Sequence, residues 1–142
     1  MKQFWNWALE NCGNPEALLG FAFWIEAERD VFDSAWLAEH VRLTLEKTRG
    51  NLEWDYGMMQ SLPILAESAP EDTLKILGCY LLGTEGLLSR RPWLCMDDEL
   101  MGIFKTLYNK LITKEGTRAL IEELIKIGSR RFWILKDVLN GK

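Results

Sequence analysis

The sequence predicts an all-α protein in which antiparallel helix pairs stack as a short HEAT- or armadillo-like superhelix. Apolar residues recur at steps of three and four along the chain, and no segment shows the alternation expected of a strand. The predicted helix pairs begin at residues 15, 53 and 97, so the intervals of 38 and 44 residues lie near one repeat length. A closed helical bundle is the alternative arrangement, because period and order alone support the superhelix.

The first part of the chain is expected to hold a flanking helix and one helix pair. The flanking helix covers residues 2–12, and the pair lies near residues 15–48. Asn14-Pro15 combines a capping side chain with a proline at the first helical position. Asp33-Ser34 offers a cap for the second helix of the pair, and Gly50-Asn51 provides its exit.

A second pair is expected near residues 53–82. Pro63 lies inside its first helix and removes one backbone hydrogen bond, so we expect a kink there and not an end. Ala69-Pro70 starts the second helix. Residues 83–96, which contain two glycines and a proline, are predicted to form one long loop.

The third pair is expected near residues 97–127, followed by a flanking helix over residues 129–139. Acidic residues at positions 97–99 suit a helix start, and Gly128 suits a helix end. The first helix of this pair is expected to run to Thr113 with one apolar stripe on its inner face. That stripe consists of Leu100, Ile103, Phe104, Leu107 and Leu111.

Size and composition predict one soluble domain over residues 1–142. Hydrophobic residues make up 48% of the chain and charged residues 27%, which is ordinary for a folded protein. The longest apolar run covers nine residues, well short of the roughly 20 that a membrane span needs. Three cysteines, Cys12, Cys79 and Cys95, form no C-x-x-C pair and favour a reducing compartment. We therefore expect a cytoplasmic protein with no membrane contact.

The rare residue types argue against an enzyme. His40 is the only histidine, which excludes a site with two histidine ligands, and its charged neighbours predict that it faces solvent. The chain has no nucleophile elbow and no phosphate-binding or dinucleotide-binding loop. Carboxylates four residues apart, such as Glu26 and Asp30, leave an acid–base enzyme open, although solvated surface groups are the ordinary expectation. We predict no catalytic residue, no cofactor and no metal.

Four segments combine apolar spacing with turn residues: Phe4-Trp5-Asn6-Trp7, Asn14 to Trp24, Leu65 to Pro70 and Ala119 to Gly128. These segments resemble the helical repeats found toward the C-termini of large bacterial multidomain ATPases. The resemblance consists of apolar spacing and turn residues and contains no catalytic residue. It implies a HEAT-like piece of a longer protein that serves contact or sensing and not turnover.

Tryptophan and arginine supply the candidate interaction residues. Trp5 and Trp7 are two positions apart, so on a helix they point about 200° apart and only one can face inward. We expect the other to meet a partner or a neighbouring repeat. Arg90 and Arg91 precede Trp93, and Arg130 and Arg131 precede Trp133, which is the pairing enriched at binding hot spots. Solvated arginines beside a buried aromatic ring are the alternative for both clusters.

The charge is divided unevenly along the chain. Residues 1–89 hold 6 basic and 14 acidic groups, a net charge of −8, whereas residues 90–142 hold 11 basic and 7 acidic groups, a net charge of +4.

The predicted function is a non-catalytic scaffold for protein–protein interaction, with self-association left open. The alternative is a module that contacts phosphate or nucleic acid through its basic C-terminal third. The overall charge of −4 and the lack of a nucleic-acid-binding motif disfavour nucleic acid. The basic groups that this alternative would use are Arg90, Arg91, Lys105, Lys110, Lys114, Arg118, Arg130 and Arg131.

Overall fold

Every regular element in the part of the chain that the structure describes is a helix. The computed structural model describes residues 2–11, 33–51, 55–84, 86–90, 97–127 and 130–140. The elements are α1 (Lys2–Asn11), α3 (Ser34–Thr48), α4 (Asp55–Ser68), α5 (Pro70–Leu82), α6 (Leu87–Arg90), α7 (Asp97–Tyr108), α8 (Lys114–Lys126), the 3-10 helix η2 (Arg130–Leu135) and α9 (Lys136–Leu139). The all-α prediction is confirmed for these residues. The start predicted at Asn14-Pro15 for the first helix of the pair near residues 15–48 lies outside them.

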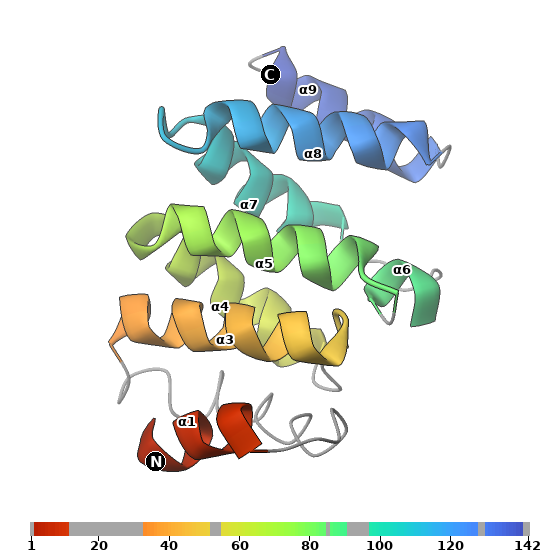
Figure 1. Cartoon of the computed structure of the whole chain (residues 1–142). Coiled ribbons are helices and arrows are strands. Elements are labelled where there is room, and N and C mark those ends of the chain that lie inside the picture. The colour runs from red at the N-terminus through yellow and green to blue at the C-terminus, as the bar shows by residue number, and fades with distance from the viewer. Residues whose placement is uncertain are drawn as a thin grey trace.

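The helices lie in two rows (Figure 1). One row consists of α3, α5 and α8, each packed on the next, and the other consists of α4 and α7, with α9 and η2 following α7. The rows are joined because α4 also packs on α5 and α7 on α8. Helix α1 packs on α3, so the N-terminal and C-terminal helices lie at opposite ends of the stack. This order leaves α8, η2 and α9 to form one end of the molecule.

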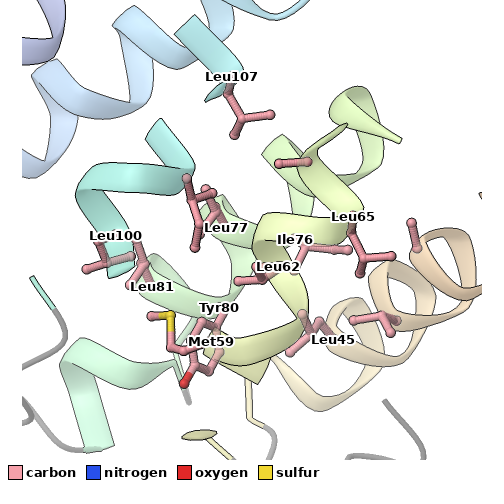
Figure 2. Close-up of a cluster of buried hydrophobic side chains, with 14 of the residues drawn as sticks. Leu45, Met59, Leu62, Leu65, Ile76, Leu77, Tyr80, Leu81, Leu100 and Leu107 are labelled. Carbon is pink, nitrogen blue, oxygen red and sulfur yellow. The ribbon is translucent and has the colours of Figure 1, made fainter. Parts of the chain in front are cut away.

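Buried apolar side chains from four helices form the centre of the core (Figure 2). They are Leu45 from α3, Met59, Leu62 and Leu65 from α4, Ile76, Leu77, Tyr80 and Leu81 from α5, and Leu100 and Leu107 from α7. Each is at most 2% exposed, and burying such a side chain contributes about 1.5–3 kcal/mol. These side chains join α3, α4, α5 and α7 in one hydrophobic core.

Close backbone packing explains the glycine at the end of α3. Arg49 takes the left-handed conformation, with φ 59°, and Gly50 follows with φ +93°. The predicted exit at Gly50 is confirmed, although Arg49 is the first left-handed residue. A β-carbon at Gly50 would collide with the carbonyl oxygen of Cys79 in α5. Only glycine allows the two helix ends to approach this closely.

Pro63 lies inside α4, and the helix continues past it to Ser68 as the sequence predicts. The predicted loop over residues 83–96 is wrong in one part, because residues 87–90 form the single-turn helix α6. Leu87 at the start of that turn is buried. The spacing of apolar residues does not predict this turn, because four residues are too few to show a helical repeat.

The predicted end of the first helix in the third pair is also wrong. Helix α7 stops at Tyr108, not Thr113, and Leu111 lies in the following turn with 92% of its surface exposed. Thr113 Oγ1 donates a 2.6 Å hydrogen bond to the carbonyl oxygen of Leu107. The amide of Lys110 donates to the same oxygen at 3.3 Å, and this turn removes Leu111 from the inner stripe.

The final flanking helix differs in type from the prediction. Residues 130–135 form the 3-10 helix η2, and only Lys136–Leu139 continue as the α-helix α9. Phe132, Leu135 and Val138 are buried and anchor this segment. Their spacing of three is the repeat of a 3-10 helix, in which positions three apart share one face.

Candidate interaction surface

A groove of about 530 Å³ lies at the C-terminal end of the molecule, between α8 and α9. Helix α8 contributes Glu122, Ile125 and Lys126 to its lining. The other wall consists of Lys136, Leu139 and Asn140. Each wall thus places an apolar residue between two polar ones.

The periodicity of α8 explains which side chains reach the groove. Ile121 and Leu124 are buried against the core, whereas Ile125 is partly buried and Glu122 is exposed. Residues 122, 125 and 126 share one helix face because positions three and four apart are neighbours. Helix α9 is held opposite this face by the buried side chain of Val138.

Large apolar side chains near the groove are exposed to solvent. Trp133 is 53% exposed and Ile134 is 50% exposed, both in η2, and Ile127 at the end of α8 is also exposed. The ammonium group of Lys136 lies 5.3 Å from the centre of the Trp133 ring, within the range of a cation–π interaction. We call Ile127, Trp133, Ile134 and the groove residues the C-terminal surface.

The C-terminal surface has a positive balance of charge. The groove lining holds Lys126 and Lys136 together with Glu122, and residues 126–142 of the sequence hold 5 basic groups and 1 acidic group. Among the described residues, neither Lys126 nor Lys136 forms an ion pair with a carboxylate. Carboxylates of another molecule would therefore complement this surface.

Of the two predicted arginine–tryptophan clusters, the structure describes one side chain, that of Trp133. Arg130 and Arg131 begin η2, and Arg90 ends α6, but only the backbone of these three arginines is described. Arg91 and Trp93 lie outside the described residues. Trp133 is thus the predicted aromatic residue that the structure places at the C-terminal surface.

Trp5 and Trp7 face opposite ways on α1, as their spacing requires. Trp5 is 0% exposed, and its indole Nε1 donates a 2.8 Å hydrogen bond to Thr44 Oγ1 in α3. Trp7 is 56% exposed. Trp5 therefore attaches α1 to α3, which leaves Trp7 as the member of the pair that is accessible to another molecule.

His40 corrects a sequence expectation. It was predicted to face solvent, but it is only 6% exposed and stacks on Trp36 with ring centres 3.7 Å apart. Its Nδ1 donates to the carbonyl oxygen of Trp36 at 2.8 Å, and its Nε2 lies 2.6 Å from Asn6 Oδ1. The charged neighbours of His40 in sequence were misleading because α1 covers this face of α3.

Several basic groups of the C-terminal third contact groups within the chain. Lys110 Nζ lies 3.4 Å from Glu67 Oε2, and Lys114 Nζ lies 5.0 Å from the centre of the Tyr108 ring. Arg118 Nη2 donates to the Tyr108 hydroxyl at 3.0 Å. Lys105 is exposed on α7. Three of these four cations thus have internal partners, which weakens the case for a continuous phosphate-binding stripe.

The described residues show no cluster of three or more potential metal ligands. Cys79 is a free thiol, and its Sγ donates to the carbonyl oxygen of Leu45 at 3.3 Å. Burial raises the pKa of the Cys79 thiol, and the negative charge of Glu46 adds to the rise, so the group is not an activated nucleophile. Glu26 and Asp30 lie outside the described residues.

None of the groove residues was among the interaction residues predicted from the sequence. Lys126, Ile125, Lys136 and Leu139 were not singled out, because each belongs to an ordinary amphipathic helix pattern. One signal was present in the sequence: Ile127 and Ile134 adjoin basic segments on both sides of the predicted boundary at Gly128. These positions come together only because η2 packs on α8 while α9 packs on α7.

The described fold and surface define an all-helical protein with helices in two packed rows and a partly apolar, positively charged end. No helix in the described part of the chain combines the length and apolar character that a membrane crossing requires. No protein-family model matches the sequence, and the searches of curated proteins and of solved structures give no match either.

Proposed function

We propose that this chain is a non-catalytic helical-repeat scaffold that binds another protein through its C-terminal surface. The observation that carries the proposal is the exposure of Ile127, Trp133 and Ile134 around the α8–α9 groove. Aromatic and aliphatic side chains next to a groove are typical of protein-binding sites, and tryptophan is enriched among residues that dominate binding energy.

The order of packing supports a HEAT-like superhelix over a closed bundle. Each helix of a row packs on the next helix of the same row, as in stacked repeats, and the two chain ends lie far along the stack from one another. A terminal repeat of such a stack requires a polar outer face when nothing covers it. The C-terminal surface carries exposed Ile127, Trp133 and Ile134 in addition to its polar residues, which fits a surface that another polypeptide covers. The similarity to ATPase C-terminal repeats is consistent with the same role.

A matched pair of isoleucines tests the proposal. Ile134 in η2 is 50% exposed and Ile64 in α4 is 48% exposed, so they provide the same residue type at nearly the same exposure. A photo-crosslinking amino acid is placed at either position in cells that express the chain. We expect a defined protein adduct from position 134 and none from position 64.

The recovered partner is then purified and titrated against the I134S and I64S variants. Loss of a side chain that becomes buried on binding removes about 1–2 kcal/mol, so I134S is expected to weaken binding on the order of tenfold and I64S to leave it unchanged. Equal adducts at both positions would refute the proposal. Recovery of nucleic acid with a steep salt dependence of binding would replace it with the phosphate-contacting alternative.

A further inference from the structure

We infer that the α8–α9 groove binds an amphipathic helix of the partner whose apolar stripe is flanked by carboxylates. This inference rests on the proposed function and specifies the partner of the same surface. It follows from the shape of the groove and from the charges on its two walls.

The two walls of the groove have the same spacing. Glu122, Ile125 and Lys126 occupy positions i, i+3 and i+4 of one wall, and Lys136, Leu139 and Asn140 occupy the same positions of the other. Four residues of helix rise roughly 6 Å, so each wall is about one helical turn long. Ile125 and Leu139, one apolar residue on each wall, fit the i, i+3, i+4 anchors of a docked helix.

The charges select the flanks of that helix. Lys126 and Lys136 lie on opposite walls, so a helix between them passes a cation on each side. Lys136 is positioned by its contact with the Trp133 ring at 5.3 Å, which reduces the side-chain freedom lost on binding. Among the described lining residues, Glu122 is acidic.

Some other cations of the chain have carboxylate partners within the chain. Arg42 lies 2.9 Å from Asp72 and 3.0 Å from Glu46, and Lys110 lies 3.4 Å from Glu67. Within the described residues, the two groove lysines form no such ion pair, and neither do exposed lysines such as Lys47 and Lys75; the groove lysines differ in lying on two walls of one groove. Carboxylates supplied by a partner would give them the pairing that these other cations have inside the chain.

An acidic helix fits better than a polyanion. Ile125 and Leu139 form the middle of the walls, and the neighbouring segments expose Ile127 and Ile134. Phosphate groups gain nothing from these side chains, whereas the apolar stripe of a helix is removed from water against them. A partner with both an apolar stripe and acidic flanks uses the whole surface.

A displayed library of helical peptides tests the inference. Every member carries the same leucine stripe at positions i, i+3, i+4 and i+7, and the flanking positions are randomised among Glu, Lys, Gln and Ser. The library is selected against three forms of the full chain. These are the unmodified protein, the groove variant K126E/K136E and a control, K47E/K75E, whose exposed lysines lie on α3 and α5. Circular dichroism verifies that all three are folded.

We expect Glu to be enriched over Lys at the flanks on the order of tenfold with the unmodified protein and the control. The preference is expected to reverse with K126E/K136E, because both wall cations become anions. Lack of enrichment of any peptide, or the same Glu preference in all three proteins, would overturn the inference. Displacement of the selected peptide by a single-stranded oligonucleotide at low salt would assign the site to phosphate instead. Occlusion of the groove by self-association, detected as a concentration-dependent mass in sedimentation, would assign it to a second copy.

The outcomes separate the two proposals. If crosslinks from position 134 recover a protein but the library shows no charge preference, the scaffold function holds and the acidic-helix inference fails. If the library shows the reversal but crosslinks from positions 134 and 64 are equal, the groove binds acidic helices and the assignment of the wider C-terminal surface fails.

Discussion

Replacing Trp5 with alanine should destabilise the protein far more than the same replacement of Trp7. Trp5 is fully buried, donates a 2.8 Å hydrogen bond to Thr44, and meets Trp36 edge to face with ring centres 5.5 Å apart. Truncating a buried tryptophan costs about 3–5 kcal/mol through lost burial and the cavity that remains. The hydrogen bond is worth about 1 kcal/mol of that total. A protein of 142 residues has a free energy of unfolding of roughly 7–20 kcal/mol, so the W5A change is large and still leaves a folded chain to measure.

Urea unfolding followed by circular dichroism measures the difference. Trp7 is 56% exposed on the same helix, and W7A is expected to change the free energy of unfolding by about 0.5 kcal/mol or less. The intermediate variant W5F keeps most of the aromatic area and loses the N–H donor, so its cost should be about 1–2 kcal/mol. Hydrogen exchange at α3 amides shows whether W5A releases α1 alone or loosens α3 as well. A W5A cost below about 1 kcal/mol, equal to that of W7A, would refute the packing of α1 on α3.

Three further predictions follow from the described contacts. G50A should destabilise the protein by several kcal/mol, because the position has φ +93° and a β-carbon would strike the Cys79 carbonyl oxygen. G78A should instead stabilise the protein by about 0.5–1 kcal/mol, because nothing lies within 4 Å of a β-carbon at this helical position. The urea midpoints of the two variants measure this difference. Burial raises the pKa of the Cys79 thiol, so the folded state holds this proton more tightly than the unfolded state. The free energy of unfolding should therefore decrease as the pH rises through the ordinary thiol range. The C79A variant should lack this part of the pH dependence. A double-mutant cycle on the 2.9 Å Arg42–Asp72 ion pair should give a coupling of about 1 kcal/mol or less that decreases at high salt; a larger, salt-independent value would contradict its partial exposure.

The helices and most of their boundaries were predictable because their determinants are local. Asp33 accepts a 3.3 Å hydrogen bond from the Trp36 amide at the start of α3, and Pro70 is the first residue of α5. These signals act within one helical turn and can be read in a single sequence. The opposite orientations of Trp5 and Trp7 also follow from helix geometry alone, since both lie in one element.

The candidate site was predictable only in part, for the same reason. Trp133 stood out by composition, but its placement beside Lys136 and near Lys126 depends on how η2 packs on α8 and how α9 packs on α7. No local rule specifies which face of one short helix meets which face of another.

The sequence by itself determined that the described chain is helical, where most helices begin, and that the charge is unevenly divided. Only the tertiary structure decided that His40 is buried under α1, that Leu111 lies in an exposed turn, and that two lysines ten residues apart flank one groove. The physical reason is the distance along the chain over which each interaction acts. Caps and helical periods reflect interactions among residues three or four positions apart, whereas burial of a side chain depends on which distant helix covers it.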